Sequence, residues 1–339
     1  MENQTSIAGS RASIENSRKT KTMIEKIMNY IFLICGLLAV VSVIFMTVYM
    51  IASGGPGIAK IGVINFLFGQ IWNPDNSQFG ILPMILGSIF ATAGAVLIAL
   101  PVGVLVAVFL AKIAPDKLSS VLRATIDLLA GIPSVVYGLL GAIIVVPLIF
   151  RLQDAFGFPT SGSLLAAIII LVIMILPTII SVSETSIRAV PKQYEDAALA
   201  LGATKMQSIF RVTVPAAKSG IVAGMVLGTG RAIGEAMAII MVAGNAAIMP
   251  ELLKPVRLLT SSIPIEWAYS SGLHREALYG IGLVLFVFIM IINTVLNAFL
   301  KRTPVGGKRF IIRQRNAINE EMFVPSKLES EKGGDDADK

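Results

Sequence analysis

The sequence predicts an all-helical membrane protein with about six transmembrane helices. Of its 339 residues, 55% are hydrophobic and only 14% are charged, whereas soluble domains average about 25% charged residues. The charges are also clustered, because long apolar stretches alternate with short polar segments. Each apolar stretch reaches the roughly 20 residues that a helix needs to cross about 30 Å of hydrocarbon.

The apolar stretches give the order of the helices along the chain. They lie at about residues 28–52, 81–111, 126–150, 163–183, 219–247 and 277–300. The first is far longer than the apolar core of a cleaved signal peptide, so we interpret it as an anchor. Pro101, Pro133 and Pro177 fall inside later stretches. We expect kinks there, since neighbouring helices can satisfy the freed backbone groups.

The positive charges predict the orientation. If the N-terminus is cytoplasmic, most of the 28 lysine and arginine residues lie in the cytoplasmic segments 1–27, 112–125, 184–218 and 301–339. The opposite side then holds only Lys60, Arg151, Lys254, Arg257 and Arg275. This asymmetry predicts a multi-pass protein of the inner cell membrane with both termini in the cytoplasm.

The domain organisation follows from the same pattern. Residues 27–302 form the expected transmembrane domain. The polar segment 1–26 is expected to be a disordered cytoplasmic tail, because it has few apolar residues to bury. Residues 303–339 form a second cytoplasmic tail, which begins basic and ends acidic.

The scarcity of reactive side chains argues against several functions. One cysteine and one histidine cannot form a disulfide or supply most ligand sets of a zinc site. No Gly-x4-Gly-Lys-Ser/Thr sequence occurs, so we expect no ATPase site of the chain's own. The net charge is +7, and the excess lysine and arginine residues lie beside helix ends on one side of the membrane. This position favours contact with membrane lipid rather than with nucleic acid. We therefore expect no catalytic residue, cofactor or metal.

The cytoplasmic loop 184–218 predicts two short helices joined at a glycine. Pro191 and Glu195 suit the start of the first helix, and Gly202 suits its C-terminal cap. Thr204 and Gln207 match a capping box that would begin the second helix, which we expect to end at Pro215. Taken alone, this loop is equally consistent with an amphipathic segment resting on the bilayer surface.

The loop also resembles a known motif. Asp196-Ala197-Ala198, Gly202 and Val212-x-Val214-Pro215 are similar to the EAA loop of ABC-importer permeases, with Asp in place of Glu and Val in place of Ile and Leu. The spacing is kept, and the changes preserve charge and apolarity. The resemblance implies that Asp196, Ala197, Ala198, Gly202 and Pro215 belong to a coupling loop that docks on a separate ATPase subunit.

Two charges lie within the fifth apolar stretch. Arg231 follows Lys218 by 13 residues, about 20 Å along a helix, which places it near mid-bilayer. Glu235 lies four residues further, where the two side chains could pair. One interpretation is a self-neutralising pair that holds helices together. The other is that both are substrate-pathway residues: Arg231 meets an anion in transit, since a guanidinium offers forked donors to an oxyanion, and Glu235 holds Arg231 when no anion is bound. Glycines 220, 224 and 228 form a ladder suited to close helix packing.

Over residues 65–300 the chain resembles the PstC family of permease subunits in phosphate-specific ABC importers. The resemblance lies mainly in three segments, Phe79-Gly-Ile-Leu-Pro83, Ala130-Gly-Ile-Pro-Ser-Val-Val-Tyr-Gly138 and Gly230-Arg-Ala-Ile-Gly-Glu-Ala-Met-Ala238, and the stretches 242–245 and 258–263 add to it. It implies a type I ABC importer permease fold and phosphate import by alternating access.

The same resemblance implies partners. These are a PstA-like sister permease, two PstB-like ATPase subunits and a PstS-like extracytoplasmic phosphate-binding protein, with the outer loops 53–80 and 248–276 as the docking surface for the last. Three alternatives remain open: an ABC permease for molybdate, tungstate or phosphonate, a secondary transporter or channel, and, least favoured, a membrane-embedded enzyme.

Overall fold

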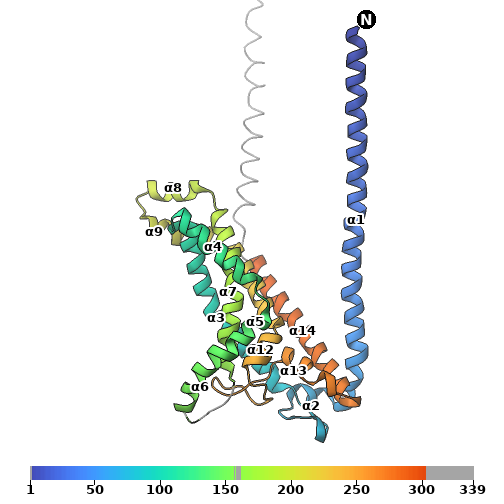
Figure 1. The fold of residues 1–339 in the computed structure, drawn as a ribbon, viewed down its shortest axis with the longest axis vertical. Helices are drawn as coiled ribbons and strands as arrows, with labels where there is room; N and C mark the ends of the chain where they lie inside the picture. Colours follow the sequence, from blue (N-terminus) through green and yellow to red (C-terminus); the bar gives the residue numbers. More distant parts are fainter. Residues whose placement is uncertain (1, 156, 158–161, 303–339) are drawn as a thin grey trace, which may run out of the picture.

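The structure, a computed structural model, describes residues 2–155, 157 and 162–302 (Figure 1). Its long helices are α1 (Glu2–Ile61), α3 (Leu82–Val108), α4 (Asp116–Gly131), α7 (Leu164–Arg188), α11 (Lys218–Gly234) and α14 (Gly272–Arg302). The shorter ones are α2 (Val63–Phe68), α5 (Ser134–Leu140), α6 (Val146–Ala155), α8 (Lys192–Ala200), α9 (Lys205–Ser208), α10 (Val214–Ala216), α12 (Met237–Val242) and α13 (Leu259–Glu266).

Tighter and wider helical turns extend several of these helices. Three π-helical segments, η2 (Phe109–Ile113), η3 (Gly141–Val145) and η4 (Ile209–Thr213), and two 3-10 turns, η1 (Pro74–Asn76) and η5 (Trp267–Tyr269), are present. The β-structure of the described residues consists of a hairpin of β1 (Trp72–Asn73) and β2 (Gln78–Phe79), in which Trp72 pairs with Phe79, and an isolated bridge between Gly244 and Val256. The predicted helical fold class is thus confirmed.

Five helices are long and apolar enough to cross a membrane, and a bent pair would make a sixth. The bent pair is Lys205–Ala216 followed by Lys218–Gly234, with 65° between its two parts. The loop that contains α8 and α9 lies at the end of the bundle that is on the same side as the N-terminus of α1 (Figure 1). Helices α2, α6 and α13 lie at the other end.

Helix α7 is the centre of the bundle. More than half of its apolar window is buried, with Leu171, Ile175 and Ile179 fully inside. Helices α3 and α11 pack along it. A Cβ at Gly103 of α3 would lie 2.8 Å from Cγ2 of Ile179. Small residues therefore let these helices approach closely, as expected for helix packing in lipid.

Helix α1 stands apart from the bundle and meets it mainly at one end (Figure 1). There Gly54 and Gly57 lie against the backbone of α14, so that a Cβ at Gly54 would come within 2.8 Å of the Tyr279 carbonyl. The hydroxyls of Tyr49 and Tyr279 are 2.9 Å apart. None of the apolar window of α1 is buried within the chain. Lipid or another subunit must therefore cover it.

The first tail differs from its prediction. Residues 2–26 continue α1 as helix, where the sequence was expected to be disordered. Extending an existing helix avoids the cost of nucleation, and this segment contains no proline. The second tail, 303–339, lies outside the described residues.

Two expected spans are shorter than predicted. The third begins at Ser134 rather than at residue 126, because Ile132 before Pro133 takes an extended conformation and separates α4 from α5. The fifth was expected to run to residue 247, but α11 ends at Gly234. Glu235 is extended, and α12 then begins a new direction. Both breaks fall in the segments that resemble the permease family.

Candidate functional site

The loop between α7 and α11 has the predicted helix-glycine-helix form. Helix α8 is followed by Gly202 with φ of +85°, a conformation that favours glycine. The capping box is confirmed, since Thr204 Oγ1 accepts from the Gln207 amide at 3.3 Å and Gln207 Oε1 accepts from the Thr204 amide at 3.0 Å. Pro215 was expected to end the second helix. It lies instead in α10, and the chain bends after Ala216.

The motif residues of this loop lie on the surface. Asp196, Ala197 and Gly202 are exposed and Ala198 is half-buried. The side chain of Leu201 is 90% exposed, and Tyr194 beside the motif is also exposed. The apolar side chains of Tyr194, Ala197 and Leu201 are therefore exposed among the described residues. Such a surface is suited to packing against another protein.

Glu195 turns the other way, toward the bundle. Its carboxylate forms an ion pair with Lys112 and accepts a hydrogen bond from Thr213 Oγ1 at 3.0 Å. Sequence reasoning treated Glu195 only as a charge favouring a helix start. The missing information was spatial, because Lys112 lies more than 80 residues away in the sequence.

The glycines of α11 lie on two faces of the helix, one packed against α7 and one open. Gly224 and Gly228 face α7, where a Cβ would lie 3.2 Å from Val182 Cβ and 2.9 Å from Ile179 Cγ1 respectively. This arrangement agrees with the packing role predicted for the glycine ladder. Gly230 and Gly234 instead have no atom within 4 Å of a Cβ position. The second face is therefore open within this chain.

Arg231 lies beside this open face, and no acidic side chain of the described residues pairs with it. Its side chain is half-buried and forms no ion pair or hydrogen bond with the described part of the chain. The expected pairing with Glu235 is absent because α11 ends at Gly234, which removes the i,i+4 geometry. Tyr137 of α5 is close enough to Arg231 for an electrostatic interaction.

Glu235 is occupied by the backbone around it. Its Oε1 accepts a hydrogen bond from the Ala238 amide at 3.0 Å, near the start of α12. Its carbonyl oxygen accepts from Thr260 Oγ1 at 2.9 Å. Glu235 therefore holds the break between α11 and α12 and ties it to α13.

A second arginine lies in a polar cluster at the opposite end from α8. Arg257 forms an ion pair with the buried carboxylate of Glu266 and donates from Nε to the Asn245 carbonyl at 2.9 Å. Glu266 also accepts from Trp72 Nε1 at 2.9 Å and contacts His274 Nε2 at 2.8 Å. The cluster joins the β-hairpin to α13 and α14. No sequence motif marked it.

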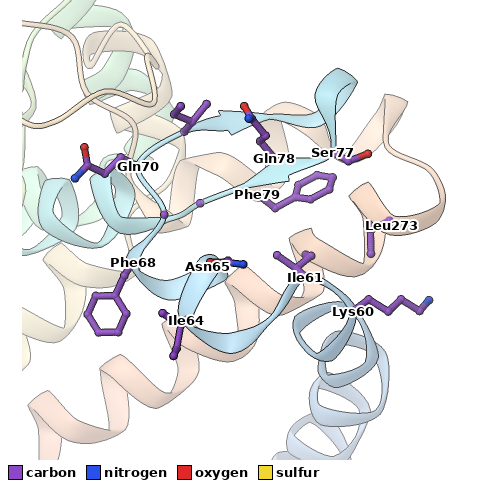
Figure 2. A pocket seen from close by; sticks show the side chains of 13 residues that line it. Lys60, Ile61, Ile64, Asn65, Phe68, Gln70, Ser77, Gln78, Phe79 and Leu273 are labelled. Atoms are coloured by element: carbon purple, nitrogen blue, oxygen red, sulfur yellow. The ribbon is translucent and has the colours of Figure 1, made fainter.

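A hollow of about 660 Å³ opens beside the hairpin (Figure 2). It lies between the end of α1, α2, the hairpin and the start of α14, and Figure 2 shows Phe79 and Ile61 on its walls. Amide side chains of Asn65, Gln70 and Gln78 line it. Apart from Leu273, its lining residues fall within the segment 53–80, one of the two segments that the family resemblance implied as a docking surface.

Comparison with known proteins places the chain in a family. Residues 99–303 match the binding-protein-dependent transport system inner membrane component family. The probable ABC transporter permease protein YqgH of Bacillus subtilis (strain 168) is 37% identical over 289 residues, covering 82% of this chain and 93% of the relative. The phosphate transport system permease protein PstC of Pasteurella multocida (strain Pm70) is 34% identical over 255 residues, covering 70% and 80%.

A solved structure shares the fold. The bacterial alginate ABC transporter, crystallised with a pentasaccharide-bound periplasmic protein, matches 79% of this chain and 92% of its own with a TM-score of 0.54. Its sequence is only 16% identical, so the likeness concerns the fold alone. The chain belongs to the family of binding-protein-dependent transport system inner membrane components, among ABC importer permeases of the PstC type.

Proposed function

We propose that this chain is the permease subunit of an ATP-driven importer that moves inorganic phosphate into the cell by alternating access. Two features support the proposal. One is a surface loop that fits an ATPase partner, and the other is Arg231, an arginine within an apolar span that forms no ion pair with the described residues. The relatives named for phosphate transport support the choice of substrate.

The observation that carries the proposal is the environment of Arg231. An arginine at the bilayer centre costs about 2.5–3.5 kcal/mol on insertion scales. A structural arginine would normally reduce this cost by pairing, yet no described acidic side chain pairs with Arg231. Its guanidinium can instead donate two parallel hydrogen bonds to a phosphate oxyanion. The open face at Gly230 and Gly234 leaves room for an approach.

Glu235 is the second proposed pathway residue. Its carboxylate caps the turn before α12 in this conformation. We expect the break at Glu235 to rearrange during transport, so that the carboxylate can neutralise Arg231 when no anion is bound. Competition of this kind would let phosphate leave the site again.

The proposed energy source is a separate ATPase. Exposed Asp196, Ala197 and Gly202, with half-buried Ala198 between them, form the surface that would enter a groove on that subunit, with Pro215 at the bend behind them. The full assembly would hold a sister permease, two ATPase subunits and an extracytoplasmic phosphate-binding protein. The α8–α9 loop and both termini would then face the cytoplasm, with lipid around the spans.

Uptake of labelled phosphate tests this function. The chain is expressed with its native partner subunits in cells that lack their own phosphate importers, with excess sulfate or molybdate as competitor. We expect ATP-dependent uptake that resists both competitors. Uptake blocked by molybdate would assign the importer to another oxyanion.

The matched control carries Gly202→Trp. Its bulk and the strained φ of residue 202 should disrupt the loop while leaving the spans intact. We expect phosphate uptake to disappear. Uptake unaffected by this change would contradict an ATPase acting through the loop.

A further inference from the structure

Helix α8 forms its polar side-chain contacts with the rest of the described chain through Glu195. Within the described residues, every side-chain hydrogen bond and ion pair between α8 and other segments involves Glu195. The carboxylate binds Lys112 and Thr213, and the backbone carbonyl accepts from Ser208 Oγ at 3.4 Å. The neighbouring Asp196 is exposed and has no such contact.

Both carboxylate partners of Glu195 lie in π-helical segments. Lys112 belongs to η2, which continues α3, and Thr213 belongs to η4, which leads into α10 and α11. The side chains of Lys112 and Glu195 are only 14% and 19% exposed. Segments of π-helix are rare and occur frequently at functional sites. A single carboxylate thus joins the coupling loop to the ends of two bundle helices.

A second carboxylate, that of Glu184, joins the helix ends next to the Glu195–Lys112 contact. Glu184 of α7 is buried and forms ion pairs with Arg123 of α4 and with Arg188. Arg188 Nη2 also donates to the Leu110 carbonyl in η2 at 2.8 Å. Helices α4 and α7 and segment η2 are therefore fastened together without α8. A displacement of α8 can therefore reach η2 and η4 through the contacts of Glu195, in addition to the peptide linker from α7.

The ionisation state of the Glu195 carboxyl favours its ion pair with Lys112. Burial raises the pKa of its carboxyl, but the hydrogen bonds from Lys112 and Thr213 outweigh this effect and hold the pKa below its ordinary value. The carboxylate is therefore ionised at neutral pH.

We propose that Glu195 is the positioning residue that passes movement of the coupling loop to α3 and α11. This inference rests on the proposed function, since it assumes that the exposed face of α8 docks on an ATPase. It assigns the two sides of one helix different tasks: Asp196 and the alanines face the ATPase, and Glu195 faces the membrane helices. Without the Glu195 carboxylate, ATP hydrolysis should continue but drive less transport.

The test is the number of ATP molecules hydrolysed per phosphate transported by the complete complex in proteoliposomes. We expect Glu195→Gln to raise this ratio at least threefold while the ATPase subunits remain bound. The adjacent Asp196→Asn is the comparison variant. It should weaken ATPase binding without raising the ratio of the complex that still assembles. An equal rise in both variants would overturn the assignment of the two faces.

A charge exchange separates coupling from folding. Glu195→Lys and Lys112→Glu should each uncouple the complex, and the two together should restore the ratio because the ion pair re-forms in reverse. A wild-type ratio in Glu195→Gln, or no recovery in the double variant, would overturn the inference. A wild-type complex that transports no phosphate would instead overturn the proposed function.

Discussion

Arginine serves different purposes in two regions of the molecule, the polar cluster around Glu266 and the end of α11. Arg257 lies in a cluster that satisfies it, with the Glu266 carboxylate and the Asn245 carbonyl as partners. Arg231 is also partly buried but has no ionic partner in the described chain. The acid nearest to it in sequence, Glu235, is used to cap α12.

The difference suggests that Arg257 stabilises the fold, whereas Arg231 is free to bind a ligand. Removing one member of a buried ion pair leaves a stranded charge and destabilises the fold. Removing an unpaired arginine relieves a solvation cost, so its loss should affect only what it binds. We therefore expect replacement of Arg257 to lower the stability of the fold, and replacement of Arg231 to lower transport but not stability.

The largest effect is expected at the cluster. Arg257→Met should strand the Glu266 carboxylate, which is 6% exposed, and lower the free energy of unfolding by about 3–5 kcal/mol. Thermal unfolding in detergent measures this loss. The double variant Arg257→Met with Glu266→Gln should recover part of it, because no charge is then left buried. A stable single variant would contradict a structural role for Arg257.

Next comes the transport effect of Arg231. Arg231→Ala should reduce phosphate uptake by about 100-fold or more, because two charge-assisted hydrogen bonds contribute about 3 kcal/mol at the least. The unfolding temperature should not fall. Arg231→Lys keeps the charge but not the fork, and an intermediate rate is expected. Normal uptake in Arg231→Ala would remove this residue from the pathway.

Much of this contrast lay beyond the sequence. Hydropathy located the spans because an apolar stretch can be recognised from consecutive residues alone. The capping box at Thr204 is also local in the sequence. The cluster at Glu266 gathers residues from Trp72 to His274, so only the folded chain brings it together. The Arg231–Glu235 pair failed for a related reason. Its prediction assumed a continuous helix, and the break at Gly234 separates the two residues.

The glycines of α11 extend the comparison to packing. Gly228→Ala should destabilise the fold by about 1–2 kcal/mol, because the added Cβ would lie 2.9 Å from Ile179 Cγ1. Gly230→Ala meets no atom and should not destabilise, since alanine favours helix. Unfolding curves of the two variants measure the difference. Equal losses would show that the Gly230 face is packed within the chain.

The smallest effect is expected at His274. Glu266 already has the Arg257 guanidinium as its counter-charge and Trp72 as a further donor, so the imidazole contributes only one of several contacts. His274→Phe keeps a ring against Phe79, whose stacking centroid distance is 6.1 Å, but loses the hydrogen bond. We expect a loss of about 1 kcal/mol in the free energy of unfolding. His274→Gln, which can still donate, should lose less. A loss in His274→Phe as large as that in Arg257→Met would mean that the histidine, rather than the arginine, holds the carboxylate in place.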